Sequence, residues 1–423
     1  MRSNARCVAA YGLPLSVPQN PIAVNRSATD LPPFLRGTDA GSFARHTVTT
    51  RWPRIGRRVI DENDFSDAVN RRLEALVDEL PDAVIRPIED DAPDVPLWNR
   101  CLERYAGQTW LEIPWYVGEA YFYRRIVEAT DYFREGPTRG QDPFAYQKRE
   151  GLAQSAEGIR ALSQSVAERS TGRSPERLRR IVRAALWGNQ ADLSMWGADE
   201  DRPDHFGSDD EDAHLLADDR GAVVEHLHSI PHPPRIDVIA DNAGFELVGD
   251  LVLIDELLAS DWAETVVLHL KAHPTFVSDA RITDVHATLD ALVADDDAAV
   301  RALAGRCRGY LSSGRLRFAD SWIWTLPLVY RELPPWTTAE LARADLVITK
   351  GDANYRRLLG DRHWDFTTPF AAVVDYFPAP VLALRTLKAE VAAGLTEAQV
   401  DRLNDTDPDW LVSGEWGVIQ FAG

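Results

Sequence analysis

The spacing of hydrophobic residues follows one period in the first half of the chain and another in the second. From Glu62 onward, one apolar stripe with helical spacing comprises Phe65, Val69, Leu73, Leu76, Val77 and Leu80. Further helices are predicted at 96–106, 114–134, 155–169 and 175–187. Ser174 suits the cap of the last one, and Pro175 its first turn. The first half is therefore predicted to be helical.

Short β-branched runs alternate with helical stretches in the second half. Strands are predicted at 235–240, 265–270, 345–349 and 417–421, and 381–388 contains an apolar run of strand-like length. Helices are predicted at 245–259, 283–294, 297–312, 353–359 and near 396–403. Such alternation is typical of an α/β fold with a mostly parallel sheet and right-handed crossovers.

Changes in composition suggest four segments. Residues 1–60 carry scattered Pro and Gly without a sustained period and are expected to form an N-terminal arm. A helical domain is expected at 61–200, an acidic linker at 201–222 and the strand-containing domain at 223–423. Just after the linker, His226, His228 and His232 lack the spacing of a helical metal pair, and the prolines nearby indicate a loop, so a structural role is favoured.

The charge balance restricts the partners. The 423 residues include 46 Lys and Arg against 66 Asp and Glu, a formal charge of -20. So acidic a surface argues against nucleic acid or an anionic membrane as a partner, and an anionic substrate would need a metal or local basic residues. Three scattered cysteines indicate neither disulfides nor a zinc site. With no signal peptide or membrane span recognisable, we expect a cytoplasmic protein.

Asp241 and Asn242 stand where the first predicted strand gives way to the helix at 245–259. In an open α/β sheet, ligands bind at the carboxyl ends of the strands. A carboxylate beside a carboxamide offers the hard oxygen donors that magnesium or manganese prefers. The same two residues also suit a helix cap or a tight turn, so this stretch alone leaves both interpretations open.

Polar residues also follow the other predicted strands. Asp279 ends the loop after the second strand, and a loop rich in polar residues opens the helix after the third strand, with Asp352, Asn354, Tyr355 and Arg356. Lys388 closes the apolar run that begins at 381. Oxygen donors for one divalent cation, together with basic residues for a phosphate, suggest metal-assisted hydrolysis of a phosphate ester. Taken singly, Asp352 also suits a helix cap, and Arg356 and Lys388 suit solvated surface charges.

A further polar group follows the helix at 175–187. Asn189 and Asp192 come directly after its end and are possible site residues. A Gly-Asn pair past a helix is also the usual C-cap.

Four motifs together resemble the metal-dependent damage-control phosphatases, in the branch with an Arg-Thr-x-Lys signature, which is also described as acidic-residue methyltransferase-like. They are Asp-Asn-Ala-Gly-Phe-Glu-Leu at 241–247, His-Pro-Thr-Phe-Val-Ser-Asp at 273–279, Lys-Gly-Asp-Ala-Asn-Tyr-Arg-Arg-Leu at 350–358 and Arg-Thr-Leu-Lys at 385–388. The resemblance implies a Rossmann-like three-layer αβα domain with a mostly parallel sheet, preceded by an α-helical domain. The implied activity is hydrolysis of sugar phosphates such as fructose 1-phosphate or fructose 6-phosphate, with manganese, cobalt, nickel or magnesium as the metal.

The resemblance also implies roles for individual residues. Asp241, Asn242 and Asp279 are the implied metal ligands. The implied substrate contacts are Glu246, Asp352, Asn354, Tyr355, Arg356 and Lys388. The general base is left open between Asp279, Glu246 and the metal alone. The extended amino terminus and the acidic stretch at 197–220 depart from the family pattern, which leaves the substrate preference open.

Three other classes compete with this interpretation. A protein carboxyl methyltransferase using S-adenosylmethionine would usually carry a glycine-rich loop after its first strand, whereas 241–244 supplies one glycine among oxygen ligands. An aspartyl-phosphate phosphatase would usually carry a second Asp two residues after its nucleophile, where Ala243 stands here. A binding protein without activity would have no reason to gather these acidic and basic residues, although structural ion pairs can mimic such a site.

Overall fold

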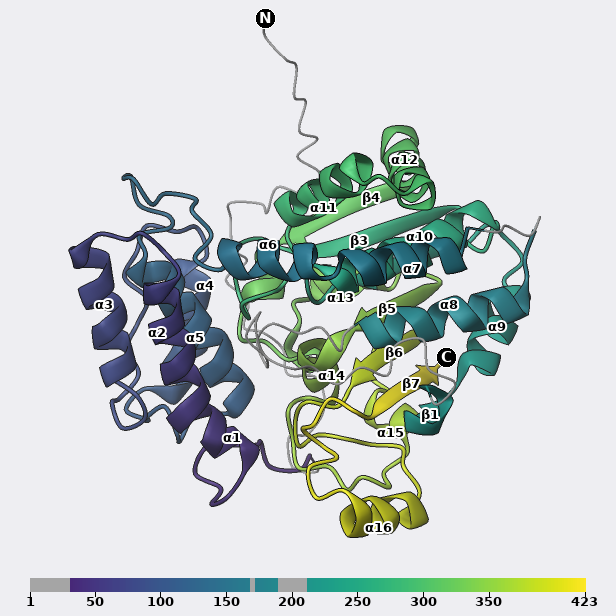
Figure 1. Ribbon diagram of the computed structural model, residues 1–423. Helices are drawn as coiled ribbons and strands as arrows, with labels where there is room; N and C mark the ends of the chain where they lie inside the picture. Colours follow the sequence, from purple (N-terminus) through teal and green to yellow (C-terminus); the bar gives the residue numbers. More distant parts are fainter. Residues whose placement is uncertain (1–30, 168–171, 189–210) are drawn as a thin grey trace, which may run out of the picture.

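The computed structural model describes residues 31–167, 172–188 and 211–423. A helical lobe stands beside a sheet that carries helices on both faces (Figure 1). The first nine helices are α1 (Phe43–His46), α2 (Trp52–Asp61), α3 (Asp67–Asp78), α4 (Val95–Leu102), α5 (Trp115–Ala129), α6 (Ala145–Gln154), α7 (Ala156–Ser165), α8 (Pro175–Trp187) and α9 (Arg220–Ser229). The later helices are α10 (Phe245–Ala259), α11 (Ile282–Ala294), α12 (Ala298–Ser313), α13 (Pro335–Leu341), α14 (Gly351–Leu359), α15 (Phe370–Val373) and α16 (Glu397–Thr406).

In the described part of the chain, the sheet has seven strands in the order β1-β7-β6-β5-β2-β3-β4. The strands are β1 (Leu215–Asp218), β2 (Arg235–Ile239), β3 (Thr265–Lys271), β4 (Leu316–Ser321), β5 (Leu346–Lys350), β6 (Val381–Thr386) and β7 (Gly417–Ala422). Neighbouring strands pair in parallel throughout, except that β6 and β7 are antiparallel. The expected α/β fold with a mostly parallel sheet is thus confirmed.

Both faces of the sheet are buried, because successive side chains of a strand point to opposite sides. On β2, Ile236 and Val238 join a hydrophobic core with α7 to α12, whereas Ile239 joins a second core with α5, α13, α14 and α15. Val347 on β5 lies in the second core, and its neighbour Ile348 in the first. The result is a three-layer αβα arrangement.

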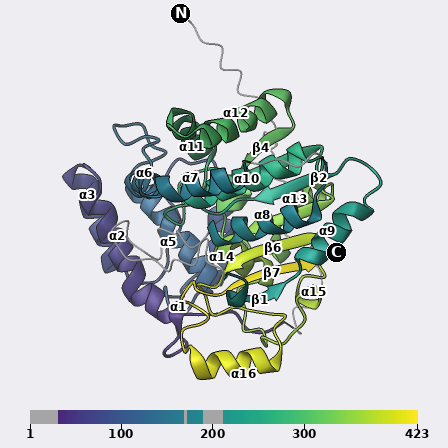
Figure 2. The same ribbon diagram turned by 45° about the vertical axis from the view of Figure 1, so that its right-hand side comes forward.

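Helices α1 to α5 form the helical lobe, which lies at one end of the sheet in both views (Figures 1 and 2). Its centre is α5, whose residues are all buried. Aromatic packing fills the lobe: Trp52 stacks on Phe122 with ring centroids 5.4 Å apart, and Trp110 stacks on Tyr121 at 4.7 Å. The lobe is therefore packed around aromatic side chains, which belong to the same hydrophobic core as one face of the sheet.

The segment expected to be an N-terminal arm contains regular structure. Residues 43–61 form α1, a π-helical turn and α2, with Trp52, Ile55 and Val59 buried against the lobe. These residues are thus helical although the sequence shows no sustained period there, and the assignment of 1–60 as an arm stays a prediction. Pro53 and Gly56 weaken the helical pattern there, although Pro in a first turn costs no hydrogen bond.

Helices α7 and α8, which lie within the segment assigned to the helical domain, pack on the sheet layer instead. Leu162, Leu178 and Ile181 belong to the same core as α10 and the sheet. The segment expected to be an acidic linker likewise contains an edge strand, since β1 pairs with β7 and α9 begins at Arg220. As a division into folding units the four segments stay a prediction.

Some elements were not expected from the sequence. Strands β1 and β4 and helices α6, α9, α13 and α15 fall in stretches without a strong period. His226 and His228 lie within α9, not in a loop, and their ring nitrogens bond to the backbone oxygens of Asp345 and Val224 at 2.8 and 3.0 Å. These bonds give both histidines a structural role.

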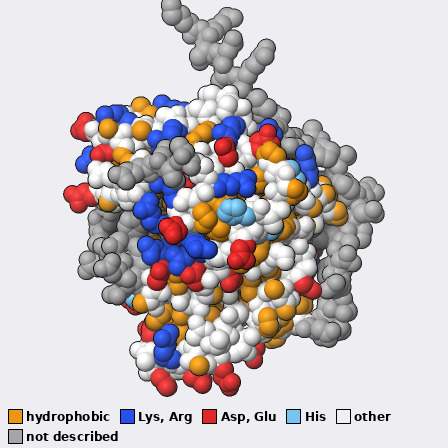
Figure 3. Space-filling view, turned by 90° about the vertical axis from the view of Figure 1, so that its right-hand side faces the viewer, with side chains coloured by type: hydrophobic (Ala, Val, Ile, Leu, Met, Phe, Trp, Pro, Cys, Tyr) orange, Lys and Arg blue, Asp and Glu red, His pale blue; other side chains and the backbone are white. Residues whose placement is uncertain are grey.

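The surface is less uniform than the net charge suggests. On the face shown in Figure 3, Lys and Arg side chains gather in one patch among apolar side chains, with Asp and Glu scattered around it. Within the described ranges, no helix is both long and apolar enough to cross a membrane.

Candidate metal and phosphate site

The predicted site residues follow the carboxyl ends of four strands that are direct neighbours in the sheet. Asp241 follows β2, Asp279 follows β3, Asp352 follows β5 and Lys388 follows β6. From β2 the chain adds β3 and β4 on one side and β5 and β6 on the other, so the strand order reverses between β2 and β5. Open α/β sheets bind ligands at such a switch point.

Two glycines make the turns that lead from strand to helix at this edge. Gly244, before α10, has a φ of 79°, and Gly351, at the start of α14, has a φ of 80°. Residues with a β-carbon seldom adopt this left-handed conformation. The two glycines therefore allow α10 and α14 to begin within a few residues of the ends of β2 and β5, with their amino termini at the same edge.

Asn242 and Asp279 face each other across a short antiparallel bridge. The bonds that flank it run from the backbone N–H of Ala243 to the oxygen of Ser278 and from the N–H of Ala280 to the oxygen of Asp241, both at 2.7 Å. This pattern is that of a non-hydrogen-bonded pair, the type in which opposed side chains come closest. The backbone thus places the second and third predicted ligands side by side.

The side chains around Asn242 form a connected network. The Asn242 amide donates to Asp241 Oδ2 at 3.1 Å and to Glu246 Oε2 at 2.9 Å, and its carbonyl oxygen accepts from the Ser278 hydroxyl at 2.6 Å. All four side chains are buried. Three of the predicted site residues, Asp241, Asn242 and Glu246, are therefore brought into direct contact.

Asp279 is held by two lysines. The Lys271 ammonium lies 2.8 Å from Asp279 Oδ2, and the Lys148 ammonium of α6 donates to the Asp279 backbone oxygen at 3.0 Å. Lys148 also pairs with Asp142 and Asp284, at 3.1 and 2.9 Å. These contacts fix both the carboxylate and the backbone of Asp279.

The loop that presents Asp279 is strained. Phe276 and Val277 have φ angles of 49° and 65°, and Val277 is fully buried. A left-handed conformation is a true outlier for a β-branched residue, and such residues cost about 1–3 kcal/mol each. Strain of this kind persists only where the surroundings enforce it.

A buried ion cluster lies behind the site. The Lys350 ammonium, fully buried, lies 2.6 Å from Asp250 Oδ1 and 3.1 Å from Glu246 Oε1. Burial raises the pKa of Asp250 to about 6; Lys350 opposes the shift and Glu246 adds to it. For the ammonium, burial is outweighed by the two carboxylates, so the Lys350 pKa is raised. Lys350 thus stays charged and orients Glu246 toward Asn242.

The donor set suits a divalent cation. Asp241, Asn242 and Asp279 offer hard oxygen donors, and each is buried and oriented by the hydrogen bonds described above. In the described part of the chain, no group of three or more His, Cys, Asp or Glu side chains is arranged to hold a metal. The present set combines two carboxylates with a carboxamide, a composition of the kind that magnesium and manganese accept.

Asp352 and Lys388 meet at the neighbouring strand ends. Asp352 Oδ1 accepts from Arg385 Nε at 2.7 Å and from the backbone N–H of Lys388 at 3.1 Å. Arg385 is fully buried and also donates to the backbone oxygen of Ala389 at 2.8 Å. The Arg-Thr-Leu-Lys motif therefore uses its arginine to fix Asp352 and the backbone that carries Lys388.

Three other predicted substrate contacts are engaged within the protein. The Asn354 amide donates to the backbone oxygens of Ala240 and Lys350, at 3.1 and 2.8 Å, and so ties α14 to the end of β2. The Tyr355 hydroxyl donates to Gln420 at 2.8 Å, and burial raises its pKa to about 12.

Arg356 points into the helical lobe. Its guanidinium bonds to Asp361 at 2.8 Å and to Glu119, and lies 3.7 Å above the Trp115 ring. These contacts pair the Arg356 guanidinium, which was predicted to bind a phosphate, with groups of the protein itself.

The remaining candidates, Asn189 and Asp192, lie outside the described residues. Lys148, Lys350, Ser278 and Arg385 were not among the predicted site residues. Lys350, Ser278 and Arg385 belong to the motifs at 350–358, 273–279 and 385–388, so these motifs could have identified them. Lys148 lies 131 positions from Asp279, in a stretch that gives no local sign of this contact.

A groove of about 530 Å³ lies at the opposite edge of the sheet. Its lining includes Arg173, His232 and Arg315, next to the starts of β2, β3 and β4. The arginines donate to backbone oxygens, Arg173 to Asp261 at 2.9 Å and Arg315 to Leu258 at 2.7 Å. The groove is thus separate from the metal site, with its arginines bound to the protein.

Most of the chain is similar to known proteins. Residues 47–403 match the model of the "Damage-control phosphatase ARMT1-like domain". The chain is 33% identical to "Damage-control phosphatase ARMT1" of Rattus norvegicus over 93% of its own length and 99% of the relative, and 30% identical to that of Homo sapiens with the same coverage. A solved DUF89 family protein from Pyrococcus horikoshii aligns with 14% identity and a TM-score of 0.46, over 88% of this chain and 97% of the other.

Proposed function

Because the chain belongs to the ARMT1-like damage-control phosphatase family, it is a phosphatase, and we propose that it is a metal-dependent enzyme acting on sugar phosphates in metabolite repair. The proposed substrates resemble fructose 1-phosphate or fructose 6-phosphate. The observation that carries the proposal is the convergence of Asp241, Asn242 and Asp279, with Asp352 and Lys388 at the neighbouring strand ends.

Asp241, Asn242 and Asp279 would hold the metal. A divalent cation bound there supplies a more acidic water and neutralises charge on the phosphoryl oxygens. The chain's acidic balance makes this contribution important, since its net charge of -20 repels an anionic substrate. Manganese, cobalt, nickel and magnesium all suit the oxygen-rich set.

The side chains beside the metal ligands are assigned to the substrate. The Lys388 ammonium would donate to the phosphate, and the carboxylates of Glu246 and Asp352 would accept hydrogen bonds from sugar hydroxyls. Lys350 holds Glu246 in place and Arg385 holds Asp352. These two positioning contacts leave the substrate-facing groups little freedom to reorient, which lowers the entropic cost of reaching the transition state.

Asn354, Tyr355 and Arg356 are assigned a different part. Each is bonded within the protein, to Ala240, Gln420 and Asp361 respectively. We assign them to holding α14 against the sheet and the lobe, so that Asp352 faces the site. The methyltransferase alternative is not favoured, because the matched family and relatives are phosphatases.

The test is phosphate release from a panel of sugar phosphates by the metal-stripped protein, with manganese, cobalt, nickel or magnesium restored one at a time. Asp241→Ala should remove the metal-restored activity, because it deletes a ligand. Asp261→Asn is the matched control: its side chain is 86% exposed and lies at the far edge of the sheet, so activity should persist.

Two results would overturn the proposal. Full metal-dependent release by Asp241→Ala would remove the assigned ligand from the mechanism. No release with any metal, combined with saturable binding of S-adenosylmethionine by the same preparation, would replace the phosphatase with the methyltransferase.

A further inference from the structure

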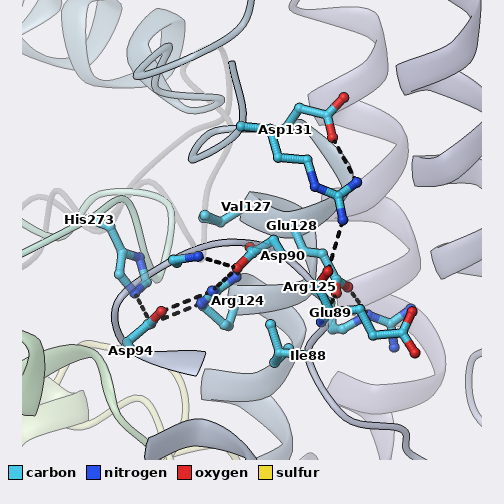
Figure 4. Close-up of polar contacts among 12 residues, drawn as sticks. Ile88, Glu89, Asp90, Asp94, Arg124, Arg125, Val127, Glu128, Asp131 and His273 are labelled. Carbon is cyan, nitrogen blue, oxygen red and sulfur yellow. Dashed lines mark hydrogen bonds and ion pairs between the residues drawn. The ribbon is translucent and has the colours of Figure 1, made fainter. Parts of the chain in front are cut away.

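A buried charge network connects the helical lobe to the loop that carries Asp279 (Figure 4). Arg124 of α5 binds Asp90 through two bonds of 2.7 and 2.8 Å and Asp94 through two bonds of 2.9 and 3.0 Å. His273, from the loop after β3, places Nε2 3.5 Å from Asp94 Oδ2. Arg124, Asp94 and His273 are at most 1% exposed.

The charged groups of this network are buried and are paired with one another. Burial opposes ionisation of Asp94, but its contact with His273 and its hydrogen bonds from the Arg124 guanidinium outweigh burial and hold its pKa at about 2. Phe133 packs against both partners of Asp94, 5.3 Å from the Arg124 guanidinium and edge-on to the His273 ring at 5.8 Å. Charged groups without solvent need such pairing to remain buried.

His273 lies at one end of the strained segment, and Asp279 at the other. Between them, Phe276 and Val277 adopt left-handed conformations. The ring of Phe276 is held by the same helix α5, since it lies 5.1 Å from the Tyr123 ring and stacks on Tyr116 at 5.9 Å. The lobe therefore contacts the loop at two points, through Asp94 at His273 and through aromatic rings at Phe276.

We propose that the helical lobe pre-organises the metal site, with Asp94 and His273 as positioning residues that hold the β3–α11 loop in the conformation that presents Asp279. This inference rests on the proposed function, since it assigns Asp279 to the metal. A strained loop relaxes when its anchor is removed. Loss of the anchor therefore moves Asp279 away from Asn242 and weakens metal binding, while the hydrophobic core that the lobe shares with one face of the sheet remains packed.

The test measures binding of manganese alone to the full-length protein by calorimetric titration. Asp94→Asn and His273→Ala should each raise the manganese dissociation constant by roughly tenfold to a hundredfold, as for other residues that orient a metal ligand. His273→Gln should recover most of the affinity, because the Gln amide can donate to Asp94 from about the position of Nε2.

The matched control is Glu79→Gln. Glu79 pairs with Arg125 on the same helix α5, at 2.7 Å, and that pair makes no contact with the loop. Its loss should lower the unfolding midpoint and leave manganese binding unchanged. With saturating manganese, kcat and KM of the folded Asp94→Asn protein should return toward the wild-type values, because the substitution changes the affinity for manganese and not the groups that contact the substrate.

The outcomes separate the two proposals. Failure of the wild type to bind manganese, or undiminished binding by Asp241→Ala, would overturn the proposed metal site itself. Wild-type affinity in His273→Ala, where Asp241→Ala abolishes binding, would overturn the positioning role alone. Since His273→Ala leaves Arg124 paired with Asp90 and Asp94, it decides the question if Asp94→Asn fails to fold.

Discussion

Substitution of Lys350 tests how much the buried ion cluster behind the site contributes to stability. Its ammonium is fully buried between Asp250, at 2.6 Å, and Glu246, at 3.1 Å. Lys350→Met keeps most of the side-chain volume and removes the charge. The substitution leaves two buried carboxyl groups without the cation they share.

The distances set the scale of the effect. With an effective dielectric constant of about 20, a charge pair at 2.6 Å attracts by about 6 kcal/mol and one at 3.1 Å by about 5 kcal/mol. Desolvation of the ions, several kcal/mol each, offsets most of this gain. The pairs thus add little net stability, but removing one partner leaves the desolvation cost uncompensated. Lys350→Met should lower the free energy of unfolding by about 3–5 kcal/mol.

The assay is equilibrium unfolding in urea at pH 7.5, followed by tryptophan fluorescence and by circular dichroism to check that the two transitions coincide. The double variant Lys350→Met with Asp250→Leu should be more stable than Lys350→Met alone, because it removes one of the orphaned carboxylates. The exposed pair Arg343 and Glu340, at 2.9 Å, is the matched control. Arg343→Met should change stability by less than about 1 kcal/mol.

Additive losses of stability in the double variant would refute the coupling between Lys350 and Asp250. If the double variant lost the sum of the two single losses, then Lys350 and Asp250 would not be coupled through buried charge. A loss for Lys350→Met no larger than that for Arg343→Met would show that water reaches the cluster.

Three further predictions concern other charged groups. Burial raises the pKa of Asp250 to about 6, so the folded state retains a proton that the unfolded state releases. The stabilisation from this group is therefore full below about pH 4 and is lost as pH rises through about 6. Asp250→Leu should remove that decline in stability, measured by urea unfolding from pH 4.5 to 7.5. Arg356→Met should destabilise the fold by about 3–5 kcal/mol, because the buried carboxylates of Asp361 and Glu119 lose the cation they share. KM for sugar phosphate should not change, and a higher KM at unchanged stability would restore its assignment as a substrate contact. Lys388→Ala should raise KM by roughly tenfold to a hundredfold with little change in kcat, as for loss of a charge-assisted hydrogen bond; an unchanged KM would exclude Lys388 from phosphate binding.

The parallel core of the sheet was predictable because its signals are local. Fully buried strands read as apolar runs of fixed length, and every parallel strand delivers its following loop to the same edge. That rule predicts Asp241, Asp279, Asp352 and Lys388 at one edge of the sheet, and in the structure they follow the ends of neighbouring strands.

The features that could not be predicted from the sequence depend on contacts between residues far apart in the chain. β1 contains only four residues and becomes a strand through pairing with β7. Arg356 stands in a motif that suits phosphate binding, yet its charge meets Glu119, 237 positions away. Lys148 reaches Asp279 from a helix without a clear apolar stripe. In each case, the contact that determines the structure does not change the pattern of hydrophobic and polar residues around it in the sequence.

The place of β7 in the sheet has a consequence for how the chain folds. β7 lies between β1 and β6, and its Phe421 bonds through the backbone N–H to Asp219, 202 positions earlier. During synthesis, β1 therefore emerges long before β7, the strand with which it pairs. Contacts of such high sequence separation form slowly. Until β7 joins the sheet, β6 also exposes an apolar edge, the kind of surface on which nascent chains aggregate and which chaperones recognise.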